Sequence, residues 1–312
     1  MDRDDQVQER YYADKEYLLP NDRPESARLN VQHRAMVKGF GGLALAQFAD
    51  LHDGDRVLES GAGTGIWALE FSKQIIQQYN VTLDIQAIDI SDKQFPRSLS
   101  SSESRGPPNI HFSIHSVLDL PSEWTATFSY AHQRLLILAM SDSRWYQSLS
   151  ELFRVLRPGG YLELVEPQGK HSLFAVGPFS KRLADLIQKM YVEKGVVTEL
   201  GEYLPRVLGE IGFVDVRVET RRFGIGIVRR GDHHRRSLSS DEREDDGGSR
   251  YSGEEWRDLW EGLKEPIVAG GGYGFLKTER EYAEILDGAM EEWNEKPDEG
   301  YAHFYTIVAR KP

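Results

Sequence analysis

The chain has 312 residues, of which 39% are hydrophobic and 11% aromatic, enough for a substantial core in one large domain or in a domain with an insert. Its formal net charge of −12 argues against general affinity for nucleic acid or anionic membranes, because both require a basic surface. Cysteine is absent, which excludes disulfides, thiolate metal ligands and a cysteine nucleophile.

No apolar run reaches the roughly 20 residues of a membrane-spanning helix, and the N-terminal segment 1–5 is too charged for a secretory signal. We therefore expect a soluble cytoplasmic protein without a membrane or nucleic-acid partner. The sequence contains no pattern that indicates an oligomeric state.

Strands and helices alternate through the first half of the chain. Residues 1–50 are expected to form an N-terminal cap, polar at first and then helical. Apolar runs and helical spacing predict strands at 55–60, 81–89, 110–114, 130–139 and 161–166, with helices at 65–79 and 145–156. This alternation is typical of an α/β fold, in which helices cover both faces of a mostly parallel sheet.

The second half is more helical. Apolar stripes predict helices at 183–191 and 204–211, and a strand follows at 213–218. Ser252 and Thr278 each stand three residues before a glutamate, the spacing of a capping box, and predict the starts of two late helices. A last strand is expected just before the C-terminus.

The segment 229–250 combines arginine and histidine pairs with an acidic run and two glycines. Its composition leaves little to bury and predicts a mobile surface loop. The pair His233-His234 could suggest a metal ion, but no other ligands flank it at a fixed spacing, so we expect no metal site.

The stretch from Glu59 to Gly65 reads Glu-Ser-Gly-Ala-Gly-Thr-Gly and lies between the first predicted strand and the first predicted helix. Glycines at such a turn let the backbone bend sharply and lie against a ligand, because a Cβ would block both. The pattern therefore predicts a site for a nucleotide-like cofactor.

Two cofactor classes fit this loop. With Gly63, Gly65 and Ala68 it matches the dinucleotide fingerprint, and Asp89 lies at about the spacing expected of a ribose-binding acid. With Glu59 and the three glycines it matches the loop that binds S-adenosylmethionine. Glu59 favours the second class, because a carboxylate binds an ammonium group but repels a pyrophosphate.

A second unit lies downstream, where the predicted helix 145–156 stops at Arg157-Pro158-Gly159-Gly160 and a strand follows. With the glycine loop and Asp89 before it, this order resembles the class I S-adenosylmethionine-dependent methyltransferases. Dinucleotide dehydrogenases have no such helix–turn–strand unit, so the resemblance favours S-adenosylmethionine as the cofactor.

Shorter motifs narrow the resemblance. The segments 16–22, 25–33, 63–68 and 131–134 are similar to the fungal methyltransferases of secondary metabolism, the group around the gliotoxin N-methyltransferase and the LaeA-like regulators. The resemblance covers nearly the whole chain apart from the loop 229–250.

This resemblance implies a Rossmann-like, seven-stranded and mostly parallel sheet with an antiparallel last strand and helical lid elements. The methyltransferase domain would span 51–312, with a lid insert at about 168–200. Glu59 would lie near the ammonium group of the cofactor, and Asp89 would accept hydrogen bonds from the ribose hydroxyls. The cofactor-binding residues that the resemblance implies are Glu59, Gly61, Ala62, Gly63, Gly65, Asp89, Ile90, Ser116, Val117 and Leu118.

The sequence departs from the family pattern at two positions. Ser116 stands where many relatives carry an acid for the adenine amino group, and Asp119 comes three residues later. Ser129 replaces the usual aspartate before the fourth strand. Val117 and Leu118 remain available to pack on the adenine ring.

Methyl transfer is an in-line displacement that mainly requires alignment of the acceptor and exclusion of water. A hydroxyl acceptor usually needs a base, and His132, beside the expected methyl position, is the candidate for that role. Arg134 is interpreted as a support for the sheet edge. Candidate substrate-binding residues come from the N-terminal cap, the mouth of the sheet and the lid: Tyr12, Tyr17, His33, Gln168, His171 and Phe174.

The leading hypothesis is a methyltransferase that acts on a nitrogen, oxygen or sulfur atom of a small, largely apolar specialised metabolite, because the expected pocket is apolar and aromatic. A second hypothesis is a protein of the same fold that binds S-adenosylmethionine without methyl transfer, as a regulator or a cyclase. A third, a dinucleotide oxidoreductase, fits only the glycine loop and Asp89.

Overall fold

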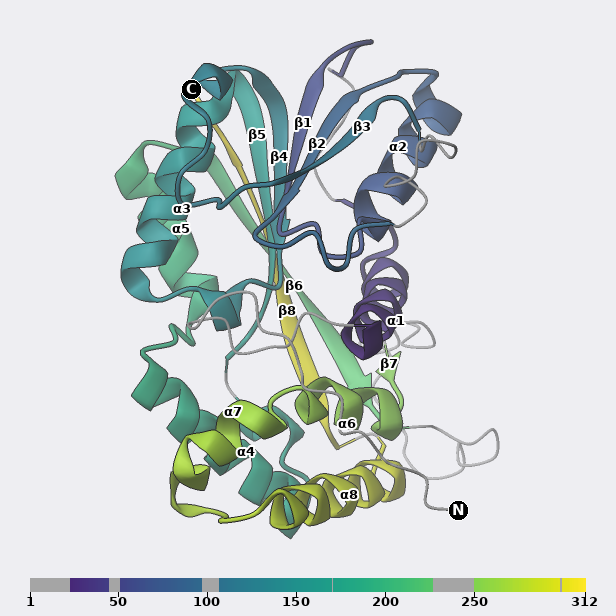
Figure 1. The fold of residues 1–312 in the computed structure, drawn as a ribbon, viewed down its shortest axis with the longest axis vertical. Helices are drawn as coiled ribbons and strands as arrows, with labels where there is room; N and C mark the ends of the chain where they lie inside the picture. The colour runs from purple at the N-terminus through teal and green to yellow at the C-terminus, as the bar shows by residue number, and fades with distance from the viewer. Residues whose placement is uncertain (1–22, 45–50, 97–106, 170, 227–249, 298) are drawn as a thin grey trace, which may run out of the picture.

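One eight-stranded sheet runs through the molecule in the order β3-β2-β1-β4-β5-β8-β6-β7 (Figure 1). The computed structural model describes residues 23–44, 51–96, 107–169, 171–226, 250–297 and 299–312. The strands are β1 (Arg56–Ser60), β2 (Asp84–Asp89), β3 (Ile110–Ile114), β4 (Phe128–Arg134), β5 (Leu156–Pro167), β6 (Val214–Ile225), β7 (Arg250–Tyr251) and β8 (Tyr301–Arg310).

Only β8 runs against its neighbours, pairing antiparallel with both β5 and β6, whereas the other strand pairs are parallel. The predicted α/β fold with an antiparallel last strand is thus confirmed. The two-residue strand β7 at the sheet edge adds to the seven strands that were predicted.

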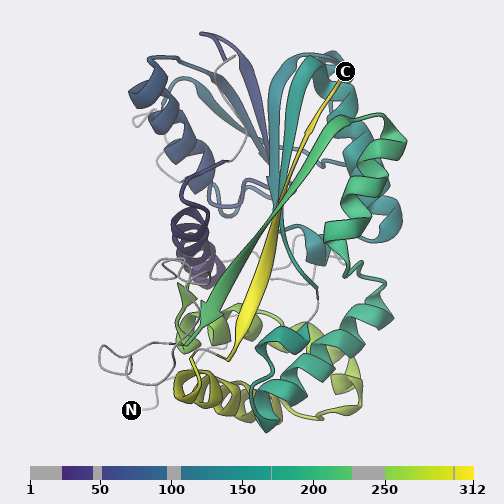
Figure 2. The ribbon, with the colours of Figure 1, turned by 180° about the vertical axis from the view of Figure 1, so that it is seen from behind.

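Helices cover both faces of the sheet and surround the far ends of two strands. They are α1 (Arg23–Phe40), α2 (Ile66–Tyr79), α3 (Asp142–Val155), α4 (Pro178–Lys194), α5 (Leu200–Ile211), α6 (Gly253–Glu261), α7 (Lys264–Ala269) and α8 (Glu279–Glu295), with short 3₁₀ turns η2 (Ser122–Trp124), η3 (Ile137–Ala139), η4 (His171–Phe174) and η5 (Gly271–Gly274). In Figures 1 and 2, α2 lies on one side of the sheet and α3 and α5 on the other, while α4, α6, α7 and α8 gather around the lower ends of β6 and β8.

Apolar periodicity in the sequence explains which helix faces are buried. In α3 the side chains of Trp145, Leu149 and Leu152 are fully buried on one face, as their spacing predicts. On the opposite side of the sheet, Trp67 and Phe71 of α2 are buried against the strands. Burying each of these side chains stabilises the fold by about 1.5–3 kcal/mol.

The lid segment and the C-terminal helices form one packed unit. Helix α4 packs against α8, whose Glu292 accepts hydrogen bonds from the backbone N–H groups of Phe179 (2.8 Å) and Ser180 (2.8 Å) and so caps the start of α4. The indole of Trp293 donates to the carbonyl of Phe174 (2.7 Å). Segments more than 100 residues apart in sequence therefore pack against each other. None of the helices in the described ranges is both long and apolar enough to cross a bilayer.

Some element boundaries differ from the predictions. The strand predicted over 130–139 ends at Arg134, because Leu135 takes a left-handed backbone conformation (φ 59°) and η3 follows. Strand β6 continues to Ile225 rather than stopping at 218, because β8 pairs with it along that length. Both predicted capping boxes, at Ser252 and Thr278, are confirmed.

The division into a cap at 1–50 and a domain at 51–312 stays a prediction. Helix α1 occupies 23–40. The loop predicted over 229–250 lies outside the described residues except for Arg250, which begins β7.

We predict that Gly160→Ala destabilises the fold. A Cβ there would lie 3.0–3.1 Å from the carbonyl oxygens of Arg157, Phe128 and Ser129, all backbone atoms of the sheet. We expect the free energy of unfolding to fall by about 1–3 kcal/mol, as measured by urea titration.

The control is Gly209→Ala, because a Cβ at this position in α5 meets nothing within 4 Å. It should leave stability unchanged or raise it by up to about 1 kcal/mol. Equal effects of the two substitutions would contradict the steric explanation.

Candidate functional site

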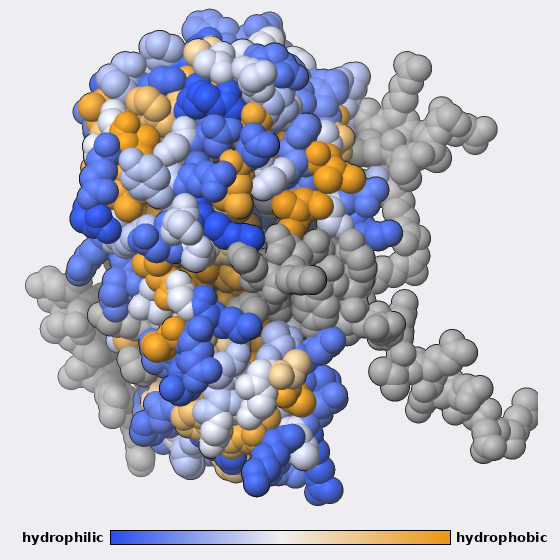
Figure 3. Space-filling view, turned by 60° about the vertical axis from the view of Figure 1, so that its left-hand side comes forward, coloured by the Kyte–Doolittle hydropathy of each residue, from blue (hydrophilic) through white to orange (hydrophobic). Residues whose placement is uncertain are grey.

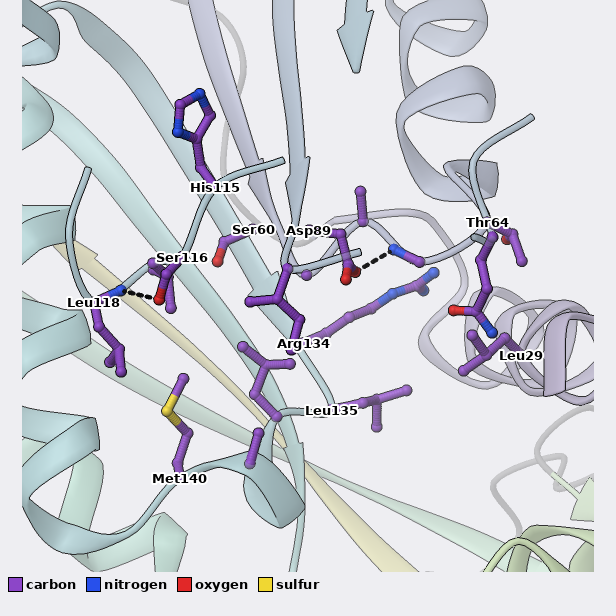
Figure 4. Close-up of a pocket in the computed structure, with 18 of the residues that line it drawn as sticks. Leu29, Ser60, Thr64, Asp89, His115, Ser116, Leu118, Arg134, Leu135 and Met140 are labelled. Carbon is purple, nitrogen blue, oxygen red and sulfur yellow. Dashed lines mark hydrogen bonds between the residues drawn. The ribbon is translucent and has the colours of Figure 1, made fainter. Parts of the chain in front are cut away.

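A pocket opens at the carboxyl ends of β1, β2 and β4, the edge where parallel α/β sheets bind ligands. We call it the glycine-loop pocket. Figure 4 shows its lining side chains: Ser60, Thr64 and Asp89 come from the ends of β1 and β2, Ser116 and Leu118 from the segment after β3, and Leu29 from α1. The remaining residues that line it are His33, Gly61, Ala62, Gly63, Ile66, Ile90, Gln94, His115, Val117, Arg134, Leu135, Leu136, Ala139, Met140 and Arg144.

The pocket brings together the predicted cofactor residues apart from Glu59 and Gly65. Those that line it are Gly61, Ala62, Gly63, Asp89, Ile90, Ser116, Val117 and Leu118. They come from three separate strand ends, so the parallel sheet explains why they meet. Gly65 lies outside the lining, and a Cβ there would meet the ring of Phe112 at 2.4 Å, so this glycine serves helix–strand packing.

Glycine is required at two positions of the loop floor. Gly61 and Gly63 have φ values of +70° and +52°, and a Cβ on them would lie 3.0 Å from Leu136 and 3.2 Å from Leu29. The Asp89 carboxylate accepts hydrogen bonds from the backbone N–H groups of Gly63 (2.9 Å) and Ser91 (3.2 Å). Burial raises the pKa of Asp89, although these hydrogen bonds oppose the shift.

The lining also offers an unused donor and an exposed apolar surface. The Nε2 of Gln94 is buried with no hydrogen-bond partner among the described residues, which marks a place for a polar ligand atom. Ile90 is 39% exposed beside Val117 and Leu118. A ligand that carries polar groups beside an apolar part therefore suits this pocket.

A second cavity, which we call the aromatic pocket, lies on the other side of Leu29 and Leu135, the two residues that line both. Most of its lining is aromatic or aliphatic, with Gln168, Gln32 and Arg28 as the polar members. The aromatic side chains are Phe174, Tyr191, Trp256, Trp260, Tyr301 and Phe304. Figure 3 shows apolar residues gathered in the hollow between the upper and lower parts of the molecule.

Comparison with known proteins agrees with this arrangement. Residues 57–160 match a family described as a methyltransferase domain. N-methyltransferase tcpN of Claviceps purpurea is 28% identical over 212 residues, which cover 66% of this chain and 72% of that protein. N-methyltransferase gliN of Aspergillus fumigatus is 27% identical over 219 residues, 67% of this chain and 72% of that protein. Secondary metabolism regulator LAE1 of Hypocrea atroviridis is 26% identical over 156 residues, 48% of this chain and 40% of that protein.

The methyltransferase domain at 57–160 and the fungal N-methyltransferase relatives support a class I S-adenosylmethionine-dependent methyltransferase. Its relatives place it in the fungal secondary-metabolism group of that family, and its cofactor is S-adenosylmethionine. The glycine floor, the Asp89 carboxylate, the unpaired amide of Gln94 and the apolar surface at Ile90 fit the chemical groups of that cofactor.

In this methyltransferase Glu59 and His132 form a buried pair beneath the glycine loop. The Nδ1 of His132 lies 2.5 Å from a carboxylate oxygen of Glu59, and each residue is 1% exposed. The imidazole stacks on the indole of Trp67, with ring centroids 3.9 Å apart. Neither side chain lines the glycine-loop pocket. The roles predicted for Glu59 at the ammonium group and for His132 as a base stay predictions.

Arg134 follows His132 by two residues and lies in the pocket itself. Its Nη2 donates to the Nδ1 of His33 (2.9 Å), whose Nε2 lies 2.9 Å from the Glu70 carboxylate. Burial lowers the pKa of His33 to about 4, and the nearby Arg134 charge adds to the shift. His33 is therefore neutral, with its proton on Nε2, and this chain of contacts fixes the position of the guanidinium.

The turn between the two pockets is held by Glu166, the next-to-last residue of β5. Its two carboxyl oxygens accept hydrogen bonds from the backbone N–H groups of Leu136 (2.8 Å) and Ile137 (3.1 Å). Leu135 precedes them in a left-handed conformation, which costs about 1–2 kcal/mol in a residue other than glycine. Two hydrogen bonds of about 1 kcal/mol each offset that cost.

The predicted substrate residues fall in different places. Gln168 and Phe174 line the aromatic pocket, whereas His33 lines the glycine-loop pocket. His171 begins η4. Tyr12 and Tyr17 lie outside the described residues.

Sequence reasoning missed several lining residues. Arg134 was interpreted as a support for the sheet edge, yet it lines the glycine-loop pocket. The aromatic side chains of α6 and β8 were also missed, although one signal was present. Trp256 and Trp260 stand four residues apart just after a capping box, and residues at that spacing share one face of a helix.

We predict that Glu166 makes stability depend on pH. Burial raises its pKa to about 8 from an ordinary value of 4.5, so between these pH values the folded protein holds a proton that the unfolded chain releases. The free energy of unfolding should therefore fall as the pH rises through this window. Urea titrations at pH 5.5 and 8.5 should show a decrease of about 3 kcal/mol attributable to Glu166.

The comparison protein is Glu166→Gln, which cannot titrate. The free energy of unfolding of wild type, minus that of the variant, should fall by about 3 kcal/mol from pH 5.5 to pH 8.5. A difference that stays constant would show that Glu166 does not titrate in this range.

Proposed function

We propose that this enzyme transfers the methyl group of S-adenosylmethionine to a small, largely apolar specialised metabolite bound in the aromatic pocket. The observation that carries the proposal is the junction of the two pockets, which share Leu29 and Leu135 as a common wall. An acceptor atom placed between these two side chains would reach the glycine-loop pocket from the aromatic pocket without crossing solvent.

The cofactor roles proposed for the lining residues follow their chemistry. The Asp89 carboxylate receives the ribose hydroxyls in place of its bond from Gly63, and Gly61 and Gly63 leave room for the ligand where a Cβ would intrude. Ile90, Val117 and Leu118 pack against the adenine ring. When bound, the cofactor supplies the electrophilic methyl group, and the chain supplies position and exclusion of water.

The lining of the aromatic pocket supports an uncharged acceptor. Apart from Arg28, its described side chains are aromatic, aliphatic or neutral amides. Gln168 is held in place by His303, whose Nδ1 lies 3.1 Å from its side-chain oxygen, so the amide can orient a polar group of the substrate. The relatives tcpN and gliN carry the name N-methyltransferase, which favours nitrogen as the acceptor atom.

The direct test is methyl incorporation. Purified enzyme, S-adenosylmethionine with a labelled methyl group and a panel of apolar secondary amines, amides, phenols and thiols should give a labelled product with at least one class. Nitrogen compounds are expected to react best. Labelling of none of them, while the cofactor product still binds, would count against transferase activity on such metabolites.

A second candidate function is binding of S-adenosylmethionine without methyl transfer, as in a regulator. The similarity to LAE1 favours it, together with Ser116 at the position where many relatives carry an acid. Detection of any labelled product would exclude this candidate as the sole function.

We predict that Ala302→Leu separates substrate binding from cofactor binding. Ala302 lies on β8, is 9% exposed and lines only the aromatic pocket, so a larger side chain fills that space. We expect kcat/KM for the acceptor to fall by about tenfold or more, through a higher KM. The affinity for S-adenosylhomocysteine should stay within about twofold of wild type.

The matched control is Ala139→Leu, because Ala139 lines only the glycine-loop pocket. Its main effect should be on cofactor affinity. An equal loss of S-adenosylhomocysteine binding in both variants would contradict the assignment of the two pockets.

A further inference from the structure

Among the residues that the structure describes, no carboxylate contacts the guanidinium of Arg134 in the glycine-loop pocket. Arg134 is partly buried at the end of β4. Its hydrogen bond goes to His33, which is neutral. A charge in such a place is costly to desolvate unless an anion meets it.

The surroundings hold the guanidinium in one position. His33 is fixed from behind by Glu70, and the His33 side chain is fully buried. In Figure 4 the Arg134 side chain extends across the pocket below Asp89, toward Leu29. A guanidinium has five N–H donors, so donors remain for a ligand after the one bond to His33. Its position and spare donors suit a carboxylate, which a guanidinium binds through two parallel hydrogen bonds.

We infer that Arg134 binds the carboxylate of the methionine moiety of S-adenosylmethionine, and that His33 and Glu70 act as positioning residues for it. That carboxylate is the one anionic group of the cofactor. The carboxyl ends of β1 and β4 lie side by side, with Ser60 paired to Gln133, so Arg134 follows directly beside the glycine loop. This inference rests on the cofactor and not on the identity of the methyl acceptor.

The alternative is that Arg134 only ties α1 to the sheet through His33. Both roles predict that replacing Arg134 harms the protein, so loss of activity does not distinguish them. A pair of ligands that differ only in the carboxylate does distinguish them. S-adenosylhomocysteine and its decarboxylated analogue form such a pair.

Isothermal titration of both ligands with wild type, Arg134→Met and Arg134→Lys is the test. Wild type should bind S-adenosylhomocysteine about ten- to a hundredfold more tightly than the decarboxylated analogue. In Arg134→Met this preference should disappear, because the affinity for S-adenosylhomocysteine falls while that for the analogue stays within about twofold. Arg134→Lys should keep part of the preference, since it retains the charge but not the fork of donors.

Arg144→Met is the matched control, because Arg144 lines the same pocket and donates to the carbonyl of Ala139 (3.3 Å). It should leave the ratio of the two affinities unchanged. His33→Phe should reduce the ratio without abolishing it, because the guanidinium stays but loses its fixed orientation.

Three results would overturn the assignment: equal affinity of wild type for both ligands, an equal loss for both ligands in Arg134→Met, or collapse of the ratio in Arg144→Met. If circular dichroism shows that Arg134→Met is not folded, the assignment is tested by the ratio of the two affinities in wild type and in Arg134→Lys. If wild type does not bind S-adenosylhomocysteine at all, both S-adenosylmethionine as the cofactor and the role of Arg134 would be wrong. Binding without transfer to any acceptor would count against the proposed function alone.

Discussion

The two hydrogen bonds to Glu166 fix the point at which β4 stops, and both pockets depend on that point. Because the Glu166 carboxyl group accepts from Leu136 and Ile137, the chain turns away from the sheet directly after Arg134. Arg134 and Leu135 therefore lie at the rim rather than inside a longer strand. A carboxyl group on β5 thus positions the wall between the glycine-loop pocket and the aromatic pocket.

Helix α1 closes the same region from the other side. Leu29 lines both pockets, Asn30 accepts a hydrogen bond from the Thr64 hydroxyl (2.7 Å), and His33 contacts both Glu70 and Arg134. His33 follows Asn30 by three residues and Leu29 by four, so its side chain lies on the same side of the helix as theirs. Helix α1 therefore contributes to the lining of both pockets, and its contacts connect the glycine loop to the common wall.

Local sequence patterns predicted the fold and most of the lining of the glycine-loop pocket. The strand–glycine–helix stretch at 56–66 is contiguous, and Asp89 ends a strand whose apolar run is visible in the sequence. Parallel strands then force these ends to meet, so short motifs were sufficient. The fine placement of Glu59 was not predictable, because its partner His132 is 73 residues away and the buried pair depends on their register across β1 and β4.

The substrate side has no such contiguous signal. Phe174 comes from η4, Trp256 and Trp260 from α6, and Phe304 from β8, and only the packing of these elements brings the rings together. Aromatic residues at helical spacing are typical of any core, so sequence alone does not separate a pocket from packing. The end of β4 was missed for a related reason, since an apolar run through Leu135 looks like strand until Glu166 is known to accept from the turn.

The two pockets are formed largely by different elements, so a substitution can alter one pocket without altering the other. The proposed cofactor contacts are backbone and side-chain groups at the ends of central strands, where a substitution disturbs the sheet register as well as the ligand. The aromatic lining lies on η4, α4, α6 and the beginning of β8, and among the described residues Leu29 and Leu135 line both pockets. Substitutions in that lining can therefore alter the acceptor while S-adenosylmethionine binding is preserved, provided that Glu166 still holds the turn. Specificity in this methyltransferase is thus expected to depend on the lining of the aromatic pocket, and cofactor binding on the strand ends of the sheet.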